Sequence, residues 1–332
     1  MQTILVTGGA GYVGSHTCLR LAEAGFRPVV YDNLSNGHAE FVQWGPLEIG
    51  DIGDAARLDE VFARHRPVAV MHFAALIEVG VSVREPGRFY ENNVAGAVTL
   101  IEAARRAGVG AFVFSSTCAT YGEPERVPLD ETHPQSPLNP YGRTKLMIEQ
   151  VLADLDRYSG FRSVCLRYFN AAGADPQGRI GERHEPETHA IPLAIRAAMG
   201  LGGTFRLMGE DYPTPDGTAV RDYIHVLDLA DAHVLALRQL LSGAPSNVYN
   251  LGTGNGTSVR ELVDAIARCA GRPFPVEKAP RREGDSPILV ADNHKARETL
   301  GWTPKFDLDA IIQSAWRWHE AESLRKEGPQ QA

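Results

Sequence analysis

The chain has 332 residues, of which 43% are hydrophobic and 22% are charged, and its net charge is −8. This composition is typical of a globular protein with a substantial core and excludes a disordered chain. The negative charge argues against non-specific nucleic-acid binding, and no apolar run approaches the roughly eighteen residues of a transmembrane helix.

Short β-branched runs alternate with helical patterns through the first half of the chain. The expected strands cover residues 3–7, 28–32, 68–75, 111–116 and 163–169. The expected helices cover residues 12–24, 55–65, 88–107 and 141–159. The strands are near-continuous apolar runs, as expected for a sheet that is covered on both faces. The alternation therefore predicts an α/β fold with a doubly wound, parallel sheet.

The second half is less regular, because loops rich in glycine, proline and acidic residues separate single helices and short strands. We expect residues 1–175 to form the nucleotide-binding domain. Residues 176–332 are predicted to form a smaller α/β domain that binds substrate over the carboxyl edge of the sheet. Some of these later segments are expected to return to the first sheet.

A glycine-rich turn follows the first expected strand in "ILVTGGAGYVGSHT" and opens a helix. Gly8, Gly11 and Gly14 are spaced as in a Rossmann dinucleotide-binding turn, where backbone N–H groups and the helix N-terminus face a pyrophosphate. Asp32 ends the next strand, where an acid accepts hydrogen bonds from the adenosine ribose. The following "NLSNG" has no arginine, which favours NAD over its 2′-phosphorylated relative.

Further cofactor contacts are predicted from position in the chain. Asp51 follows the third strand and could hold the adenine amino group together with the Ile52 backbone, although it could instead cap the 55–65 helix. Other candidates are placed at the end of the fourth strand or at the start of a helix. The remaining cofactor candidates are Tyr12, Val13, Asn33, Phe73, Ala74, Ala75, Asn92, Ser115 and Tyr168.

A tyrosine and a lysine lie four residues apart in "SPLNPYGRTK", which starts a helix. Tyr141 and Lys145 therefore share one helix face, and the hydroxyl of Thr117 ends the fifth strand nearby. A phenol has a pKa of about 10, and a neighbouring ammonium together with an oxidised nicotinamide would favour the phenolate. The alternative is a surface helix with a solvated lysine.

Seven motifs together resemble the extended short-chain dehydrogenase/reductase family, and within it the enzymes that invert C4 of UDP-hexoses. They are "VTGGAGYVGSHT", "FSSTCATYG", "PYGRTK", "LRYFNAAGA", "VRDYIHVLDLADAH", "YNLGTG" and "APRREGD". The resemblance implies a catalytic triad of Thr117, Tyr141 and Lys145. Tyr141 would remove the proton of the sugar 4-OH while C4 transfers hydride to NAD.

The implied reaction is the NAD-dependent interconversion of UDP-galactose and UDP-glucose through a 4-ketose. The alternatives are 4-epimerisation of another UDP-sugar, such as an N-acetylhexosamine, pentose or uronate, or an inactive NAD-binding regulator. Dehydration is not expected, because Cys118 and Ala119 stand where sugar-nucleotide dehydratases of this family carry an Asp-Glu pair.

The same resemblance implies how the sugar nucleotide is held. Arg221 and Arg282 match positions that clasp the diphosphate, and Asp285 would accept from the uridine ribose. Alternatively, Arg221 forms an ion pair with Asp222 or Asp228, and Arg282 is a solvated charge. The other predicted substrate contacts are Thr117, Tyr141, Asn170, His189 and Tyr223.

Two positions depart from the pattern of the family. Ile77 stands where some members carry a lysine near the nicotinamide, and Leu289 occupies the position associated with acceptance of N-acetylated sugars. The consequence of either departure for the cofactor contact or the substrate range stays open.

Three further expectations concern metals, assembly and location. The string "HEPETH" resembles a zinc-binding helix motif, but His184 and His189 are five residues apart with Pro186 between them, so we expect no metal. The resemblance implies a homodimer that pairs through helices near 88–107 and 141–159. Four scattered cysteines without a CxxC pair indicate reduced thiols and a cytoplasmic location.

Overall fold

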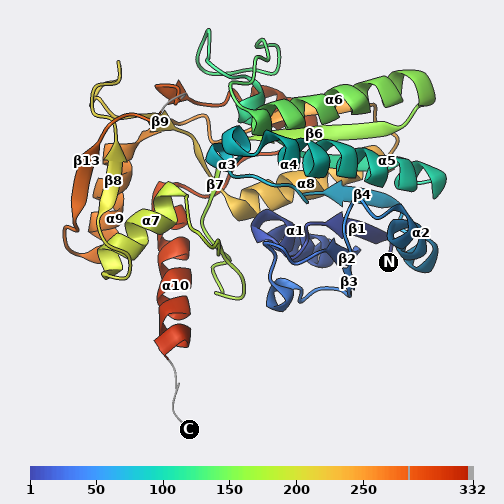
Figure 1. Ribbon diagram of the computed structural model, residues 1–332, viewed down its shortest axis with the longest axis horizontal. Coiled ribbons are helices and arrows are strands. Elements are labelled where there is room, and N and C mark those ends of the chain that lie inside the picture. Colours follow the sequence, from blue (N-terminus) through green and yellow to red (C-terminus); the bar gives the residue numbers. More distant parts are fainter. Residues whose placement is uncertain (283–284, 328–332) are drawn as a thin grey trace.

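A seven-stranded parallel sheet forms the centre of the computed structural model, which describes residues 1–282 and 285–327 (Figure 1). The strand order is β11-β6-β5-β4-β1-β2-β3, so the chain starts in the middle of the sheet and winds outward in both directions. The strands are β1 (Thr3–Thr7), β2 (Arg27–Asp32), β3 (Leu47–Ile49), β4 (Ala69–His72), β5 (Ala111–Thr117), β6 (Arg162–Tyr168) and β11 (Asn247–Leu251). The predicted doubly wound Rossmann sheet is confirmed.

Helices cover both faces of this sheet, which explains why its strands are apolar on both sides. On one face lie α2 (Ala55–His65), α5 (Ala97–Arg106) and α6 (Pro140–Ser159). On the other face lie α1 (Tyr12–Glu23) and α8 (Val226–Leu241), which pack against each other. Buried side chains such as Leu5 and Val6 alternate between the two cores.

The predicted strands and helices of the first half all exist, with small differences at their ends. The fourth strand ends at His72 rather than at residue 75, because the N–H groups of Phe73 and Ala74 both turn back to the carbonyl of Thr7, at 2.9 and 3.1 Å. The expected helix over 88–107 is composite. It comprises α4 (Pro86–Tyr90), a π-helical turn (Glu91–Gly96) and α5.

The later part of the chain builds a second region beside the sheet, on the left in Figure 1. It contains three small sheets, with the strand orders β10-β7, β12-β9-β14 and β13-β8. Its strands are β7 (Asn170–Ala172), β8 (Phe205–Met208), β9 (Val220–Arg221), β10 (Tyr223–His225), β12 (Thr257–Ser258), β13 (Val276–Ala279) and β14 (Ile288–Leu289). Its helices are α7 (Ala190–Met199), α9 (Val259–Ala270) and α10 (Leu308–Glu327). The short helix α3 (Val79–Arg84) instead follows β4 and contacts α4 and α6.

Between these small strands the chain returns to the central sheet, where β11 pairs with β6 and α8 covers one face. The predicted division at residue 175 stays a prediction. Among residues 1–282 and 285–327, the helices are too short or too polar for any of them to cross a membrane.

Candidate functional site

The glycine-rich turn between β1 and α1 leaves no space for side chains at two positions. Gly8 has a φ of +72°, and a Cβ atom there would lie 2.5 Å from the Ala74 nitrogen. A Cβ at Gly14 would lie 2.2 Å from the Gly8 carbonyl oxygen, because the first turn of α1 packs directly on the loop. Gly11 is the residue that precedes α1. This bare cradle at a helix N-terminus fits the pyrophosphate of a dinucleotide.

Asp32 lies at the end of β2, beside the glycine-rich turn. Its carboxylate accepts from the backbone N–H groups of Ala10, at 3.0 Å, and Leu34, at 2.9 Å. Burial is the largest influence on this group and raises the pKa of Asp32, whereas the two backbone hydrogen bonds lower it. The carboxylate is thus fixed where an adenosine ribose is expected, and the cradle and this acid together suit NAD.

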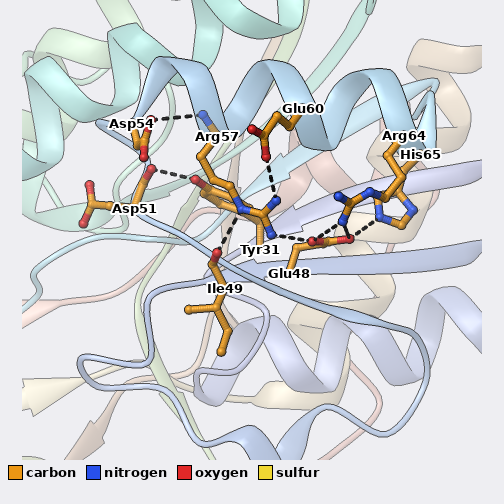
Figure 2. Close-up of polar contacts among 9 residues, drawn as sticks. All are labelled: Tyr31, Glu48, Ile49, Asp51, Asp54, Arg57, Glu60, Arg64 and His65. Atoms are coloured by element: carbon orange, nitrogen blue, oxygen red, sulfur yellow. Dashed lines mark hydrogen bonds and ion pairs between the residues drawn. The ribbon is translucent and has the colours of Figure 1, made fainter.

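The segment after β3 carries Asp51, and Figure 2 shows how it is anchored. The Tyr31 hydroxyl donates to the Asp51 carbonyl at 2.8 Å, while the Asp51 side chain accepts from Gly53 N–H and from the Asn33 amide. The alternative role of Asp51 as a helix cap is wrong. Asp54 caps α2 instead, by accepting from the Arg57 N–H at 3.0 Å. The neighbouring Ile52 is buried.

Asn92 does not open a helix, contrary to the sequence prediction. It lies inside the π-helical turn that joins α4 to α5, and its amide donates to the side chain of Asn93 at 2.8 Å. Sequence reasoning missed Asn93, which is buried and hydrogen-bonds both backbone groups of Leu76, at 2.8 and 2.9 Å. Asn93 therefore fixes the loop after β4, close to the cofactor candidates Phe73, Ala74 and Ala75. No local signal singles it out, because Glu91 and Asn92 directly before it are polar as well.

Two other cofactor candidates on α1 have different environments. Tyr12 is buried, and its hydroxyl donates to the Gly173 carbonyl at 2.6 Å. Its side chain therefore links α1 to the segment after β7. Only the backbone of Tyr12 is then left to face the glycine-rich turn. Val13 is partly exposed in the first turn of the helix.

Tyr141 and Thr117 lie together where α6 begins and β5 ends. Asn139 caps α6 by accepting from the Gly142 N–H at 2.9 Å, and Pro140 occupies the first turn. The Thr117 hydroxyl accepts from the Ala119 N–H at 3.1 Å and is close enough to influence the Tyr141 phenol. In the protein alone, burial is the largest influence and raises the pKa of Tyr141, while the Thr117 hydroxyl opposes that rise.

Lys145 lies one turn further along α6 and is 3% exposed. Its ammonium donates to the Ser115 carbonyl at 2.9 Å and lies 5.0 Å from the centre of the Phe114 ring. Burial lowers the pKa of Lys145 from 10.5 to about 7, and the negative charge of Glu149 partly counteracts this effect. The surface-helix alternative is wrong for this lysine, because its charged end is inside the protein.

A buried hydrogen-bond network supports this pair from β5 and β6. The hydroxyls of Ser115 and Tyr168 are 2.5 Å apart. Burial raises the pKa of Tyr168 to about 12, and the Ser115 hydrogen bond opposes that rise. Sequence reasoning missed the ion pair between Arg167 and Glu149, at 2.6 Å, which also binds Ser116. This pair positions α6 against the sheet.

Arg221 and Asp285 lie close together in the second region. Arg221 ends β9, and its guanidinium is 3.8 Å from the Asp285 carboxylate. The alternative pairing of Arg221 with Asp222 or Asp228 is wrong. Asp222 accepts from backbone N–H groups, including that of Thr253 at 2.7 Å, and Asp228 accepts from the backbone at 3.0 and 3.2 Å.

The other substrate candidates surround this part of the second region. Leu289 pairs with Arg221 in the β14–β9 ladder and packs in a small cluster with Cys118. Asn170 begins β7 with an exposed side chain, and its N–H donates to the Asp222 carbonyl at 3.0 Å. Burial raises the pKa of Tyr223 to about 12.

The last two substrate candidates are Arg282, on the surface, and His189, beside a cavity. Arg282 is exposed at the end of the described stretch 1–282. His189 immediately precedes α7 and borders a cavity of about 240 Å³, which Ile77 also lines. The opposite wall of this cavity is the loop after Asp32, with Leu34 and His38. His189 thus faces the predicted cofactor region.

Comparisons with known proteins agree with this arrangement. Residues 4–252 match the model of the NAD dependent epimerase/dehydratase family. A UDP-glucose 4-epimerase of Rhizobium leguminosarum bv. trifolii is 67% identical over 318 residues, which cover 96% of this chain and 97% of that protein. Both findings cover most of the chain.

Solved structures of UDP-glucose 4-epimerases have closely similar folds. The UDP-glucose 4-epimerase of Brucella ovis in complex with NAD is 52% identical, with a TM-score of 0.93 over 96% of this chain and 98% of that one. The enzyme of Bifidobacterium longum in complex with NAD+ and UDP is 36% identical, with a TM-score of 0.93 over 97% of this chain and 99% of that one. The chain therefore belongs to the NAD dependent epimerase/dehydratase family, within the extended short-chain dehydrogenases/reductases.

Proposed function

We propose that this protein is an NAD-dependent UDP-glucose 4-epimerase that interconverts UDP-galactose and UDP-glucose. The observation that carries this proposal is the placement of Tyr141 and Lys145 at the start of α6 and of Thr117 at the carboxyl end of β5, with Thr117 and Lys145 buried. Both this group and the glycine cradle lie at the carboxyl ends of strands of one parallel sheet, which suits a reaction on a nicotinamide, and the named relatives support the substrate.

In the proposed mechanism, Tyr141 holds and moves the proton of the sugar 4-OH. Thr117 orients that oxygen through its hydroxyl, and the Lys145 ammonium lowers the cost of a phenolate on Tyr141. Bound NAD would supply the reversible oxidation at C4. The glycine cradle, Asp32 and the Asp51 segment would hold it, with Ser115 and Tyr168 at the nicotinamide end.

The resulting 4-ketose must present both faces for the configuration to invert. The site therefore needs a firm hold on the diphosphate and a loose hold on the sugar. Arg221 and Arg282 would supply the cations, and Asn170, Tyr223 and His189 would add polar contacts. On binding, Asp285 would exchange its ion pair with Arg221 for the uridine ribose.

Purification without added NAD, followed by an assay with UDP-galactose, tests this proposal. We expect the protein to retain NAD and to form UDP-glucose without further cofactor, which NMR of the sugar protons would detect. Absence of conversion even with NAD supplied would overturn the proposal. UDP-N-acetylhexosamines, UDP-pentoses and UDP-uronates belong in the same assay, because Leu289 lies beside Arg221.

A substitution separates substrate binding from folding. Arg221→Met should raise the KM for the UDP-sugar and leave the NAD content unchanged. Arg281→Met is the matched control, because Arg281 is exposed and pairs with Asp211 at 2.7 Å. An unchanged KM in Arg221→Met would reject its role in binding the diphosphate.

The proposal extends to assembly and location. We expect a homodimer formed through the helices near 88–107 and 141–159, and Met147 and Tyr158 are exposed apolar side chains of α6. Size-exclusion chromatography with light scattering would measure it. The four cysteines are free thiols, which suits the reducing cytoplasm.

A further inference from the structure

Four side chains with metal-ligand chemistry converge in the segment that precedes α7. They are Glu182, His184, Glu187 and His189, and their nearest donor atoms all lie within 4.8 Å of one another. The sequence argument that these residues share no helix holds, since α7 begins at Ala190. The segment brings them together without a helix.

Three of the separations between donor atoms, at 3.4 to 4.0 Å, are near those of ligands around a four-coordinate ion, whereas His189 and Glu182 are in direct contact and would have to move apart. His184 Nδ1 is 3.4 Å from Glu182 Oε1 and 3.8 Å from Glu187 Oε1. His189 Nδ1 also contacts Glu182 Oε1 and lies 4.0 Å from Glu187 Oε1. Ligands about 2.0–2.2 Å from a tetrahedral zinc ion are themselves about 3.3 Å apart. Small shifts of these side chains would therefore complete the coordination.

The buried carboxylates of this cluster need positive charge beside them, which either protonated His184 and His189 or a bound cation can supply. The side chains of Glu182 and Glu187 are 5% and 3% exposed, and buried carboxylates are costly unless they are paired. The adjacent Arg183 turns away from them, because it pairs with Glu40 at 2.5 Å and Glu322 at 2.6 Å. A divalent cation would neutralise both carboxylates.

One imidazole nitrogen has carboxylate oxygens nearby but no hydrogen bond to either of them. His184 Nδ1 is buried and has no hydrogen-bond partner among the residues that the structure describes. Both Nδ1 atoms face the same oxygen of Glu182, so either protons or a metal ion must lie between them. A metal ion would satisfy both nitrogens and the carboxylates at once.

Contacts outside the cluster hold the carboxylates in place. Glu187 Oε1 accepts from the backbone N–H groups of Thr188, at 2.8 Å, and His189, at 2.9 Å. The Trp318 indole on α10 donates to the Glu182 carbonyl at 2.9 Å. Carboxylates that bind metals are commonly oriented by such hydrogen bonds. The hydrogen bonds at Glu182 and Glu187 form in the protein without a metal ion.

We propose that Glu182, His184, Glu187 and His189 bind one divalent transition-metal ion. Two imidazoles and two carboxylates favour zinc, or a similar ion such as Co²⁺ or Ni²⁺, over Mg²⁺ and Ca²⁺, which prefer all-oxygen sites. The ion would fix residues 182–189, which contact α10 through the Trp318 indole and α1 through the Tyr12 ring, 6.3 Å from that of His184. It is separate from the proton-transfer group at Tyr141, and because His189 would bind the ion through Nδ1, its Nε2 is left for the proposed contact with substrate.

Metal analysis of the full-length protein tests this proposal directly. After removal of metals with a chelator, titration with Co²⁺ should give about one equivalent bound, with the intense visible bands of a tetrahedral site. Zinc added afterwards should abolish those bands by displacement. Failure of the protein to bind either ion would overturn the proposal and leave a protonated histidine pair as the explanation of the cluster.

Variants locate the ion. His184→Gln and Glu187→Gln should each abolish the Co²⁺ bands, whereas His294→Gln should retain them. His294 is the matched control because it also pairs with a glutamate, Glu298, at 3.0 Å, but on the exposed surface. Circular dichroism and NAD content would verify folding of each variant. Unchanged Co²⁺ bands in folded His184→Gln and Glu187→Gln would place the metal elsewhere and reject this site.

Discussion

Glu48 and Lys145 are both buried charged residues, but Glu48 has oppositely charged partners and Lys145 has a neutral one. Glu48, on the outermost strand β3, accepts from Arg57 at 2.6 Å, Arg64 at 2.9 Å and His65 at 2.6 Å (Figure 2). Lys145, near the centre of the sheet, donates to a neutral carbonyl, and among the described residues no carboxylate lies in ion-pair contact with it.

The pKa values follow this difference. The hydrogen bond from His65 is the largest influence at Glu48 and, with those from the arginines, lowers the pKa of Glu48 from 4.5 to about 2. At Lys145, burial dominates and lowers the pKa to about 7. A charge with partners is held in one ionisation state and serves stability. A buried charge without a counter-ion stays near its titration point, where it can assist proton transfer.

The largest expected effect is that of Tyr141→Phe. If the phenol carries the proton of the sugar 4-OH, its loss should reduce kcat on the order of 100-fold or more. Steady-state kinetics with UDP-galactose would measure this, and NAD content would show that the cofactor site is intact.

Tyr249→Phe is the matched control for that change. Tyr249 is a buried tyrosine on β11, and its hydroxyl donates to Gln239 at 3.1 Å. A Tyr141→Phe variant as active as Tyr249→Phe would show that the buried group at Tyr141 is structural, like the group at Glu48.

A smaller effect is expected for Lys145→Met. The ammonium favours the Tyr141 phenolate, so its removal should raise the pKa of Tyr141 and lower kcat about tenfold or more at neutral pH. The activity that remains should recover as pH rises, because a higher pH replaces the missing charge in favouring the phenolate. The pH profile of kcat would measure this shift.

Lys295→Met tests whether the loss of another partly or fully buried lysine also shifts the pH profile of kcat. Lys295 also donates to a backbone carbonyl, that of Val248 at 2.8 Å, and also lies over an aromatic ring, Tyr249, at 5.3 Å. Its replacement should leave the pH profile of kcat unchanged. If both variants shift the profile equally, the unpaired charge at Lys145 has no special role.

The sequence predicted those parts of the molecule that depend on local patterns. Apolar runs and helical spacing located the central sheet, and the glycine spacing located the bare cradle at Gly8 and Gly14. The pair of Tyr141 and Lys145 follows from helix periodicity alone. These features need few long-range contacts, so the sequence carries them directly.

Contacts between distant segments could not be predicted in the same way. Asn93 reaches the backbone of Leu76, 17 residues earlier in the chain, and the pairing of Arg221 with Asp285 joins β9 to a later loop. Similarly, the helix-based argument about "HEPETH" did not consider that an irregular segment can bring its side chains together. Such contacts depend on the tertiary fold, which a local pattern does not determine.

The smallest expected effect is that of Glu48→Gln, which tests the paired half of the comparison. The pKa of Glu48 is lower in the folded protein than its usual 4.5, so its stabilising contribution is present above pH 4.5 and is lost as pH falls toward 2. The variant should lose about 1 kcal/mol of unfolding free energy at neutral pH, and this deficit should shrink in acid. Glu60→Gln is the control, because Glu60 contacts the same Arg57 at 3.1 Å but is 64% exposed, so we expect little change. Urea unfolding at several pH values would measure both variants. Because Tyr141 and Lys145 lie on α6 and Thr117 on β5, away from β3, activity should be normal in both, and a loss of activity in Glu48→Gln would show that the two groups are coupled through the sheet.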